Sequence, residues 1–277
     1  MFENILGHDN VKKQLKSDFE ESKVSHAYLF LGIEGIGKKT LAIEFAKKLL
    51  NTDNLETCVD YKYIEKLPDK KEIIVEQVRN KIVNDVYVAP ATGNYKVYIV
   101  NDAHLLNTAA QNALLKTLEE PPNYVVIILI SNNEKALLTT VLSRVKKVNF
   151  NSLSNSDVEA LLASKYNLEI SNSKLEYAGG SLKVAIELAN MEDNKYLKLD
   201  ELHSCYKKRD VIAAIKCVEQ VSFKDEETFN YLQYLFMQDR DYSKIQFIEK
   251  ARNRMRRNAN EDMVKQALNI QLMKGGR

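Results

Sequence analysis

The sequence predicts an α/β protein in which a domain built on a parallel sheet is followed by helices alone. Between residues 27 and 150, short apolar segments alternate with segments of helical periodicity, an order typical of parallel sheets covered by helices. Two apolar segments, Lys96–Val100 (KVYIV) and Tyr124–Ile130 (YVVIILI), are unbroken, as in strands buried on both faces. From Ser152 onward the strand signals disappear. We therefore expect an α/β domain over residues 1–150, a small helical lid domain over 151–193 and an all-helical domain over 194–277.

The first elements follow from the spacing of apolar residues. Val11, Leu15 and Phe19 recur every four residues, which predicts an amphipathic first helix. The segment 51–72 is polar and interrupted by Pro68, so we expect a connection there with one short strand at 59–64. The other elements of this half are predicted as a strand at 28–31, helices at 41–50 and 73–84, and a loop at 86–94.

The rest of the sheet domain is organised by the two unbroken strands. A helix should begin at Thr108, because Thr108 and Gln111 have the spacing of a capping box, and it should stop before Pro121 and Pro122. The segment YVVIILI is expected at the centre of the sheet. The later elements are predicted as a helix at 137–144, a strand at 145–150, and helices at 154–166, from 175 and after a cap at Ser181.

Composition indicates an ordinary globular protein. The 277 residues are 45% apolar and 28% charged, and the formal charge of +2 gives no overall signal for nucleic-acid binding. The chain has no apolar run of about 18 residues and no basic segment followed by an apolar one at its start, so we expect a cytoplasmic protein without membrane contact. Cys58, Cys205 and Cys217 stand apart without metal-ligand spacing and are interpreted as free thiols.

A glycine-rich stretch, LFLGIEGIGKKT at 29–40, joins a strand to a helix as a phosphate-binding loop does. In the pattern G-x-x-x-x-G-K-[ST], backbone N–H groups and the lysine bind phosphates, and the hydroxyl binds Mg²⁺. Gly32, Gly37 and Lys38 fit this pattern, and Gly35 adds a further break between strand and helix.

The metal-binding position of this loop is altered. Lys39 stands where the hydroxyl should be, and Thr40 follows one residue late, rotated by about 100° on a helix. Polar residues also follow two other predicted strands, at the sheet edge where parallel sheets bind ligands. These residues are Asn101 and Asp102 after one strand, and Ser131 and Asn132 after the other.

Taken together, the motifs resemble those of the AAA+ ATPases and, within them, the bacterial clamp-loader subunits of DNA polymerase III. The resemblance covers most of residues 1–190 in order, and QNALLKTLEEPP followed by a Ser-Arg pair is its most specific part. It extends over the segments ILGHDNVKKQL, SHAYLFLG, the glycine loop, KVYIVNDAH, QNALLKTLEEPP and LSRV.

The resemblance implies a role for each altered position. In the family, the strand that corresponds to KVYIV is followed by an aspartate that helps to hold Mg²⁺ and then by a glutamate that orients the attacking water. Here these positions hold Asn101 and Asp102. Ser131 and Asn132 lie where a polar residue senses the γ-phosphate. Lys183 lies where the lid usually supplies an arginine, and lysine lacks its forked geometry. We therefore expect that hydrolysis is lost and that no cofactor is required. Whether the loop still binds ATP or ADP stays an open question.

One catalytic feature of the family is retained. The pair Ser143-Arg144 matches the start of the Ser-Arg-Cys motif, whose arginine acts in trans on ATP bound by the neighbouring subunit. The third residue is Val145 instead of cysteine. The alternative interpretation is an arginine at a helix end that forms a surface ion pair.

Two further parts of the chain bear on partners. Residues 51–72 contain only Cys58, so the four-cysteine zinc module of many relatives is absent or rebuilt without metal, and no metal site is expected. The C-terminal helices weakly resemble the family's oligomerisation collar, although about 80 residues is short for it. An apolar stripe from Ile248 to Ile270 is more typical of internal packing than of an interface. The arginines of this segment (252, 254, 256 and 257) indicate a solvated face more than a DNA contact.

An altered nucleotide site with an intact arginine finger is similar to the delta-prime subunits. The resulting hypothesis is a non-catalytic, stator-like clamp-loader subunit, which works with the motor (gamma/tau) and delta subunits, the sliding clamp and primer-template DNA. Two alternatives stay open: an ATP-hydrolysing gamma/tau-type motor subunit, and a nucleotide-regulated DNA-binding protein that acts alone.

Overall fold

The computed structural model describes residues 1–2, 5–190 and 193–274, and the chain divides into two compact units over residues 1–186 and 187–277. The α/β domain and most of the expected lid lie in the first unit. The expected boundary at residue 193 adjoins residues 191–192, which lie outside the described residues. Within the described chain, every helix is too short or too polar to span a lipid bilayer.

The described part of the first unit holds a five-stranded sheet whose strand pairs are all parallel. Its strand order is β2-β3-β4-β1-β5, so the apolar strand β4 is central, as predicted. The pairing register sets Leu31 opposite Ser131, which brings the ends of β1 and β4 together. The strands are β1 (Ala27–Leu31), β2 (Tyr61–Ile64), β3 (Lys96–Val100), β4 (Val125–Ser131) and β5 (Lys146–Asn149).

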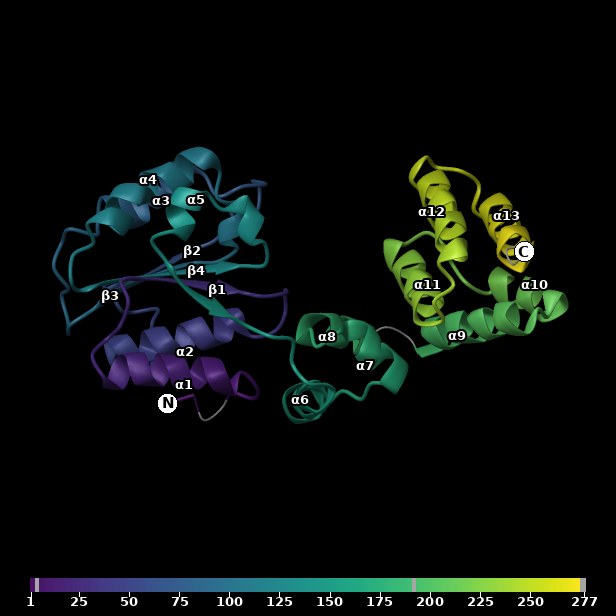
Figure 1. Ribbon diagram of the computed structural model, residues 1–277, viewed down its shortest axis with the longest axis horizontal. Helices are drawn as coiled ribbons and strands as arrows, with labels where there is room; N and C mark the ends of the chain where they lie inside the picture. Colours follow the sequence, from purple (N-terminus) through teal and green to yellow (C-terminus); the bar gives the residue numbers. More distant parts are fainter. Residues whose placement is uncertain (3–4, 191–192, 275–277) are drawn as a thin grey trace. The chain divides into compact units, whose positions relative to one another are not determined.

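Helices cover both faces of the sheet, with α1 and α2 on one face and α3, α4 and α5 on the other (Figure 1). Alternation along β1 explains this arrangement, because successive side chains of a strand point to opposite faces. Leu29 packs in the cluster that includes Leu114 of α4, whereas the Tyr28 ring lies 5.7 Å from that of Phe45 in α2. The helices are α1 (Asp9–Glu20), α2 (Lys38–Leu50), α3 (Val75–Val78, continued by a π-helical turn at Arg79–Val83), α4 (Thr108–Glu119) and α5 (Thr139–Leu142).

The start of α4 differs from the prediction. The helix begins at Thr108, but its N-cap is Asn107, whose side chain accepts a hydrogen bond from the Ala110 N–H at 2.9 Å. The capping box of Thr108 and Gln111 is therefore wrong. Buried Gln111 instead donates to the Ala136 carbonyl at 3.0 Å and accepts from the Leu138 N–H at 2.7 Å, so it ties α4 to the segment that leads into α5.

The helices of the lid segment pack partly on the glycine loop. They are α6 (Asn155–Leu161, continued by a π-helical turn at Leu162–Tyr166), α7 (Asn172–Ala178) and α8 (Leu182–Asn190). Ser181 caps α8, as predicted, by accepting from the Val184 N–H at 3.3 Å. The Gly180 carbonyl accepts from the Leu153 N–H at 3.3 Å, which joins the start of α8 to the start of the lid segment.

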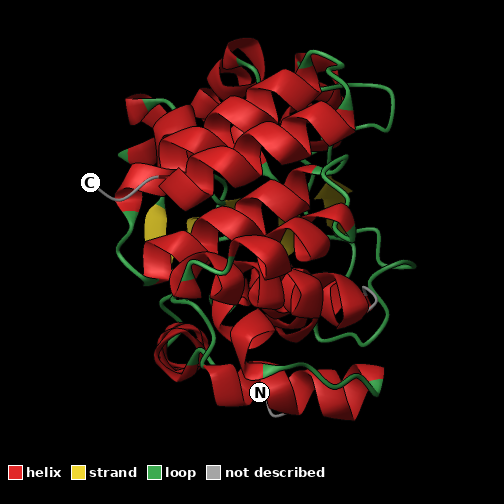
Figure 2. Cartoon of the chain, turned by 90° about the vertical axis from the view of Figure 1, so that its right-hand side faces the viewer, coloured by secondary structure: helices red, strands yellow, loops and turns green. Residues whose placement is uncertain are grey.

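The described part of the second unit consists of helices (Figure 2). They are α9 (Asp193–Lys208), α10 (Val211–Glu219), α11 (Glu226–Gln238), α12 (Tyr242–Arg256) and α13 (Glu261–Lys274). Aromatic side chains form much of its core, including Tyr206, Phe229 and Phe236. The asparagine and arginine break at 257–260 separates α12 from α13, so the single apolar stripe expected through this segment is wrong: Ile248 is buried, but Ile270 is 54% exposed.

Candidate nucleotide loop and arginine site

The glycine loop lies between β1 and α2, where a phosphate-binding loop would lie. Gly37 caps α2 with a left-handed backbone (φ +95°), a conformation that glycine adopts without strain. Gly35 is also left-handed (φ +78°), and a Cβ there would lie 2.4 Å from the Lys183 Cβ of α8. The loop therefore needs glycine at residue 35 both for its turn and for the close approach of the lid.

The loop lysine binds the loop itself. The Lys38 ammonium donates to the Gly32 carbonyl at 2.7 Å and to the Ile33 carbonyl at 2.5 Å, and the residue is only 7% exposed. Burial lowers the pKa of Lys38, and the nearby carboxylates of Asp102 and Glu34 oppose this shift. The cation expected to bind phosphate is thus held inside the turn by backbone carbonyl groups.

The neighbouring residues do not replace the missing hydroxyl. The Lys39 ammonium lies 4.7 Å from the centre of the Tyr63 ring in β2 and 4.0 Å from a Glu65 carboxylate oxygen, so it contacts the edge strand. Thr40 lies on the exposed side of α2. Lys39 and Thr40 therefore point to different sides of α2, and neither one takes the place of the Ser/Thr hydroxyl of the full pattern.

The strand ends hold the expected polar residues, but their groups are engaged locally. The Asn101 amide donates to the Asp102 carboxylate at 2.9 Å, and Asp102 has a left-handed backbone (φ +52°). Ser131 is fully buried, and its hydroxyl donates to the Asn133 carbonyl at 3.0 Å, which closes a turn after β4. Asn132 is exposed. Of this pair, Asn132 alone presents its side chain to solvent.

These donors do not fit the Mg²⁺ that the fold family implies. Mg²⁺ prefers oxygen ligands and negative charge, whereas the loop offers Lys39 in place of a hydroxyl and Asn101 in place of a carboxylate. Asp102 is the remaining carboxylate at the strand end, and it faces the Asn101 amide. Across the described residues, no group of three or more His, Cys, Asp or Glu side chains is arranged to hold a metal ion.

The lid lysine pairs with the loop. The Lys183 ammonium lies 2.6 Å from a Glu34 carboxylate oxygen, and this hydrogen bond lowers the pKa of Glu34. The Ser181 hydroxyl donates to the Glu34 carbonyl at 2.8 Å, and the Leu182 N–H donates to the Gly35 carbonyl at 2.9 Å. These three contacts join the loop to the first turn of α8.

Arg144 lies just after α5 and is partly exposed. One of its terminal nitrogens, Nη1, donates to the Thr140 carbonyl at 2.8 Å and to the Ser143 hydroxyl at 3.0 Å. The other, Nη2, lies 2.9 Å from a carboxylate oxygen of Glu119 at the end of α4. The surface ion pair considered for this arginine is therefore present, while 33% of its side chain stays exposed.

The sequence reasoning placed the expected residues but missed their partners. Glu34 was missed because its partner, Lys183, is 149 positions away in the sequence. Glu119 was overlooked as well, and its only signal is an acidic residue at the end of a helix next to a proline pair. His8 was also missed: Nε2 of its ring donates a hydrogen bond to the Ile36 carbonyl at 2.7 Å and so supports the loop.

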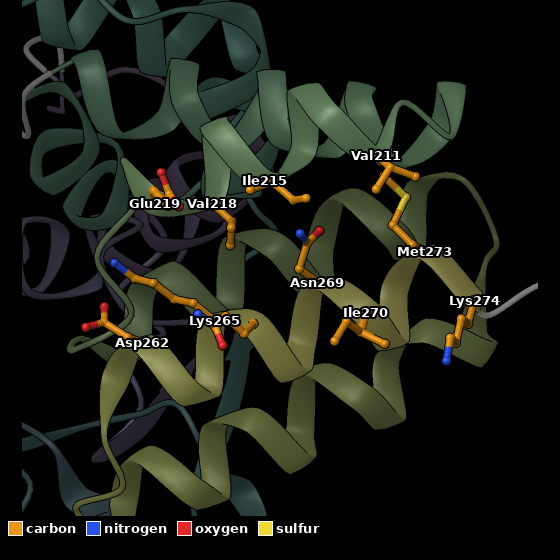
Figure 3. Close-up of a pocket in the computed structure, with 11 residues that line it drawn as sticks. Val211, Ile215, Val218, Glu219, Asp262, Lys265, Asn269, Ile270, Met273 and Lys274 are labelled. Atoms are coloured by element: carbon orange, nitrogen blue, oxygen red, sulfur yellow. The ribbon is translucent and has the colours of Figure 1, made fainter.

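A separate apolar groove lies in the second unit between α10 and α13 (Figure 3). It has a volume of about 760 Å³. Asn269 is 6% exposed, and its side-chain oxygen has no hydrogen-bond partner among the described residues. The apolar lining consists of Val211, Ile215, Val218, Ile270 and Met273.

The arginines at the end of α12 are less open to solvent than expected. Arg252 and Arg256 form ion pairs with the Glu226 carboxylate at 3.6 and 2.7 Å.

Comparison with known proteins gives one family. The model of the family described as "DNA polymerase III, delta subunit" matches residues 7–154. The DNA polymerase III subunit gamma of Buchnera aphidicola subsp. Schizaphis graminum is 30% identical over 207 residues, which are 68% of this chain and 57% of that protein. The subunit tau of Escherichia coli is 34% identical over 177 residues, which are 58% of this chain and 26% of that protein. The chain thus spans less than two thirds of either relative.

Solved structures agree with the fold. A crystal structure of a DNA polymerase III gamma subunit-related protein from Thermotoga maritima superimposes with a TM-score of 0.56 at 19% identity, covering 97% of this chain and all of that chain. At this level of identity the likeness concerns the fold alone, and it includes the helical second unit.

Proposed function

Because this chain belongs to the DNA polymerase III delta-subunit family, we propose that it is a clamp-loader subunit that acts by binding and does not hydrolyse ATP itself. In this proposal it is a stator of the delta-prime type. It assembles with motor (gamma/tau) subunits and a delta subunit and helps to load the sliding clamp on primed DNA.

The observation that carries the non-catalytic role is the pair of residues at the metal-binding positions, Lys39 and Asn101. Lys38 keeps one of its three N–H donors for a phosphate, because two backbone carbonyl groups of the loop accept the others. The Lys183 ammonium is likewise paired with Glu34 and not directed at a free site. Lys39 and Asn101 stand in the metal-binding positions and are poor ligands for Mg²⁺. The site therefore lacks the metal ion whose positive charge would stabilise a transferred phosphoryl group.

Arg144 supports the second part of the proposal, which is action on a neighbouring subunit. Arginine supplied in trans stabilises the negative charge of the transition state. The guanidinium lies at the surface after α5 and is not enclosed by its own domain. The exposed apolar groove of the second unit supports assembly, because the corresponding helices of a partner subunit would cover it.

Reconstitution tests this function. The chain is assembled with gamma/tau and delta subunits, sliding clamp and primed DNA, and ATP turnover is compared with that of the Arg144→Ala variant. An arginine finger raises the rate at the site it serves by roughly 10³-fold or more. The variant should therefore lose the ATP turnover of the one neighbouring site that Arg144 serves, while the other sites of the complex and its assembly are unchanged. Arg79→Ala, which removes another exposed arginine of the same unit, is the control. Full turnover in a fully assembled Arg144→Ala complex would exclude the finger.

The gamma and tau names of the relatives favour a different function, that of a motor subunit. A motor predicts Mg²⁺-dependent ATP turnover by the chain alone that is abolished by Lys38→Ala. We expect no turnover above buffer from the isolated chain. Turnover that depends on Lys38 would replace the stator proposal with the motor.

A further inference from the structure

We propose that Glu119 is a positioning residue that orients the Arg144 guanidinium toward the phosphate of the neighbouring subunit. This inference rests on the proposed function, since it concerns how the finger is held. Its basis is the contact between Arg144 Nη2 and the Glu119 carboxylate at 2.9 Å, together with the two contacts of Nη1 with residues of α5 and its end.

The contacts leave part of the guanidinium available. A guanidinium carries five N–H donors in a fixed plane. Thr140 and Ser143 use both donors of Nη1, and Glu119 uses one donor of Nη2. Two donors therefore remain, one on Nε and one on Nη2, and they lie on a side chain that is 33% exposed. The plane of the group is set by its own domain while its remaining edge can bind an anion.

The two residues meet because of how α4 and α5 are packed. Gln111 hydrogen-bonds the Ala136 carbonyl and the Leu138 N–H, which fixes the segment before α5 against α4. Val141 of α5 and Leu114 of α4 share one buried cluster. These contacts pack α5 and the segment before it against α4, and the Glu119 carboxylate lies beside the guanidinium as a result.

The local charge at the end of α4 also favours this pairing. Glu119 is the last residue of the helix, where the backbone carbonyl groups give a partial negative charge. A carboxylate at this end adds to that charge, and a cation such as the Arg144 guanidinium relieves it. The arginine is therefore attracted to one place among the many that its flexible side chain could reach.

The ion pair is too weak to hold Arg144 back from a phosphate. The Glu119 side chain is 49% exposed, and ion pairs between exposed side chains are only marginally stable in water. A phosphate group carries more negative charge than one carboxylate and can accept hydrogen bonds from the two open donors. Glu119 thus restricts the guanidinium before the encounter without competing for the edge that binds.

The test uses the reconstituted complex with Glu119→Ala. The expected result is a loss in kcat of about threefold to tenfold at the neighbouring site, the effect of leaving one long side chain unordered, with KM for ATP unchanged. Glu119→Gln should recover part of the rate, because its amide oxygen still accepts from Nη2. The matched control is Glu120→Ala, which removes the adjacent exposed carboxylate at the end of the same helix.

The outcomes separate the inference from the function beneath it. In the double variant Glu119→Ala/Arg144→Ala, turnover should equal that of Arg144→Ala, because the glutamate acts only through the arginine. A normal kcat for Glu119→Ala, or a raised one, would overturn the positioning role while the Arg144→Ala result stands. An unchanged rate for Arg144→Ala would overturn the proposed function and this inference together. Equal assembly and equal thermal midpoints of all variants establish that folding is not the cause.

Discussion

Two residues that the motifs single out, Lys38 and Arg144, contact partners that the motifs do not predict. Lys38 has the place of a phosphate-binding lysine and binds the carbonyl groups of its own loop. Arg144 stands where the motif predicts a finger and forms an ion pair with a glutamate of its own domain. In both cases the motif predicts the residue type, whereas the folded chain decides the partners: Lys38 binds carbonyl groups of its own loop, and Arg144 meets a carboxylate 25 residues earlier in the sequence.

His8 gives a prediction at this scale. Its ring bonds the Ile36 carbonyl of the loop and lies edge-on to Phe150, with ring centres 4.9 Å apart. Burial lowers the pKa of His8 below its ordinary value of 6.5. The unfolded chain therefore binds more protons near and below pH 6.5, so His8 adds stability above that pH and loses it as the pH falls.

We expect the free energy of unfolding to fall between pH 7.5 and pH 5, and His8→Asn to remove part of that fall. Asparagine is a suitable replacement because it tolerates the left-handed backbone at residue 8 (φ +56°). Urea unfolding at several pH values measures the slope. His203, whose pKa burial also lowers, should account for part of the remaining dependence. An identical slope in the variant would show that His8 titrates as it does in the unfolded chain.

At the scale of elements, the loop and the first turn of α8 form one packed unit. Gly35 allows this contact, because a Cβ at this position would lie 2.4 Å from the Lys183 Cβ and 2.5 Å from the Ser181 hydroxyl. Gly37 has a similar left-handed backbone, but a Cβ there would meet nothing within 4 Å among the described residues. The two glycines thus separate backbone strain from the cost of moving the lid.

Gly37→Ala should lower the free energy of unfolding by about 1–2 kcal/mol, the cost of a left-handed alanine. Gly35→Ala should lower it by about 1–3 kcal/mol more, because the added methyl group also overpacks the lid contact. Urea unfolding of both variants gives the difference. Equal losses would mean that the contact between the loop and α8 is not tightly packed in solution.

At the scale of the whole molecule, the second unit carries exposed apolar side chains at and around the groove between α10 and α13. Ile215 of α10 is 46% exposed and lines the groove, and Ile212 on the same helix is 71% exposed outside it. In the proposed assembly, helices of a partner subunit cover the groove. A charge placed in that interface would lose its hydration when the partner binds, which costs free energy.

Ile215→Lys is therefore expected to weaken assembly with gamma/tau subunits by about tenfold or more, the effect of disrupting a well-packed interface position. Ile212→Lys, on the same helix but outside the groove, should weaken it much less. Both positions are exposed in the isolated chain, so its thermal stability should change little. Sedimentation of mixtures with the partner subunits measures the effect. Equal assembly by Ile215→Lys and the parent chain would place the interface elsewhere.

Sequence alone determined the parallel sheet, its central strand and the position of the glycine loop, because unbroken apolar runs and glycines act locally. It also located Lys39, Asn101 and Arg144 within the motifs. It failed at the cap of α4 and at the helix break near residue 258, where competing polar residues and side-chain packing decide the outcome.

Only the tertiary structure decided what the charged groups of the site bind. Glu34 meets Lys183 and Glu119 meets Arg144 because the folded chain brings α8 to the loop and α5 to the end of α4. Local patterns carry no signal for such pairs, since electrostatic contacts depend on distance in space and on burial. For that reason the sequence predicted an altered nucleotide site, and the structure added the partners of its charged groups: Lys38 binds carbonyl groups of its own loop, Lys183 pairs with Glu34, and Arg144 pairs with Glu119.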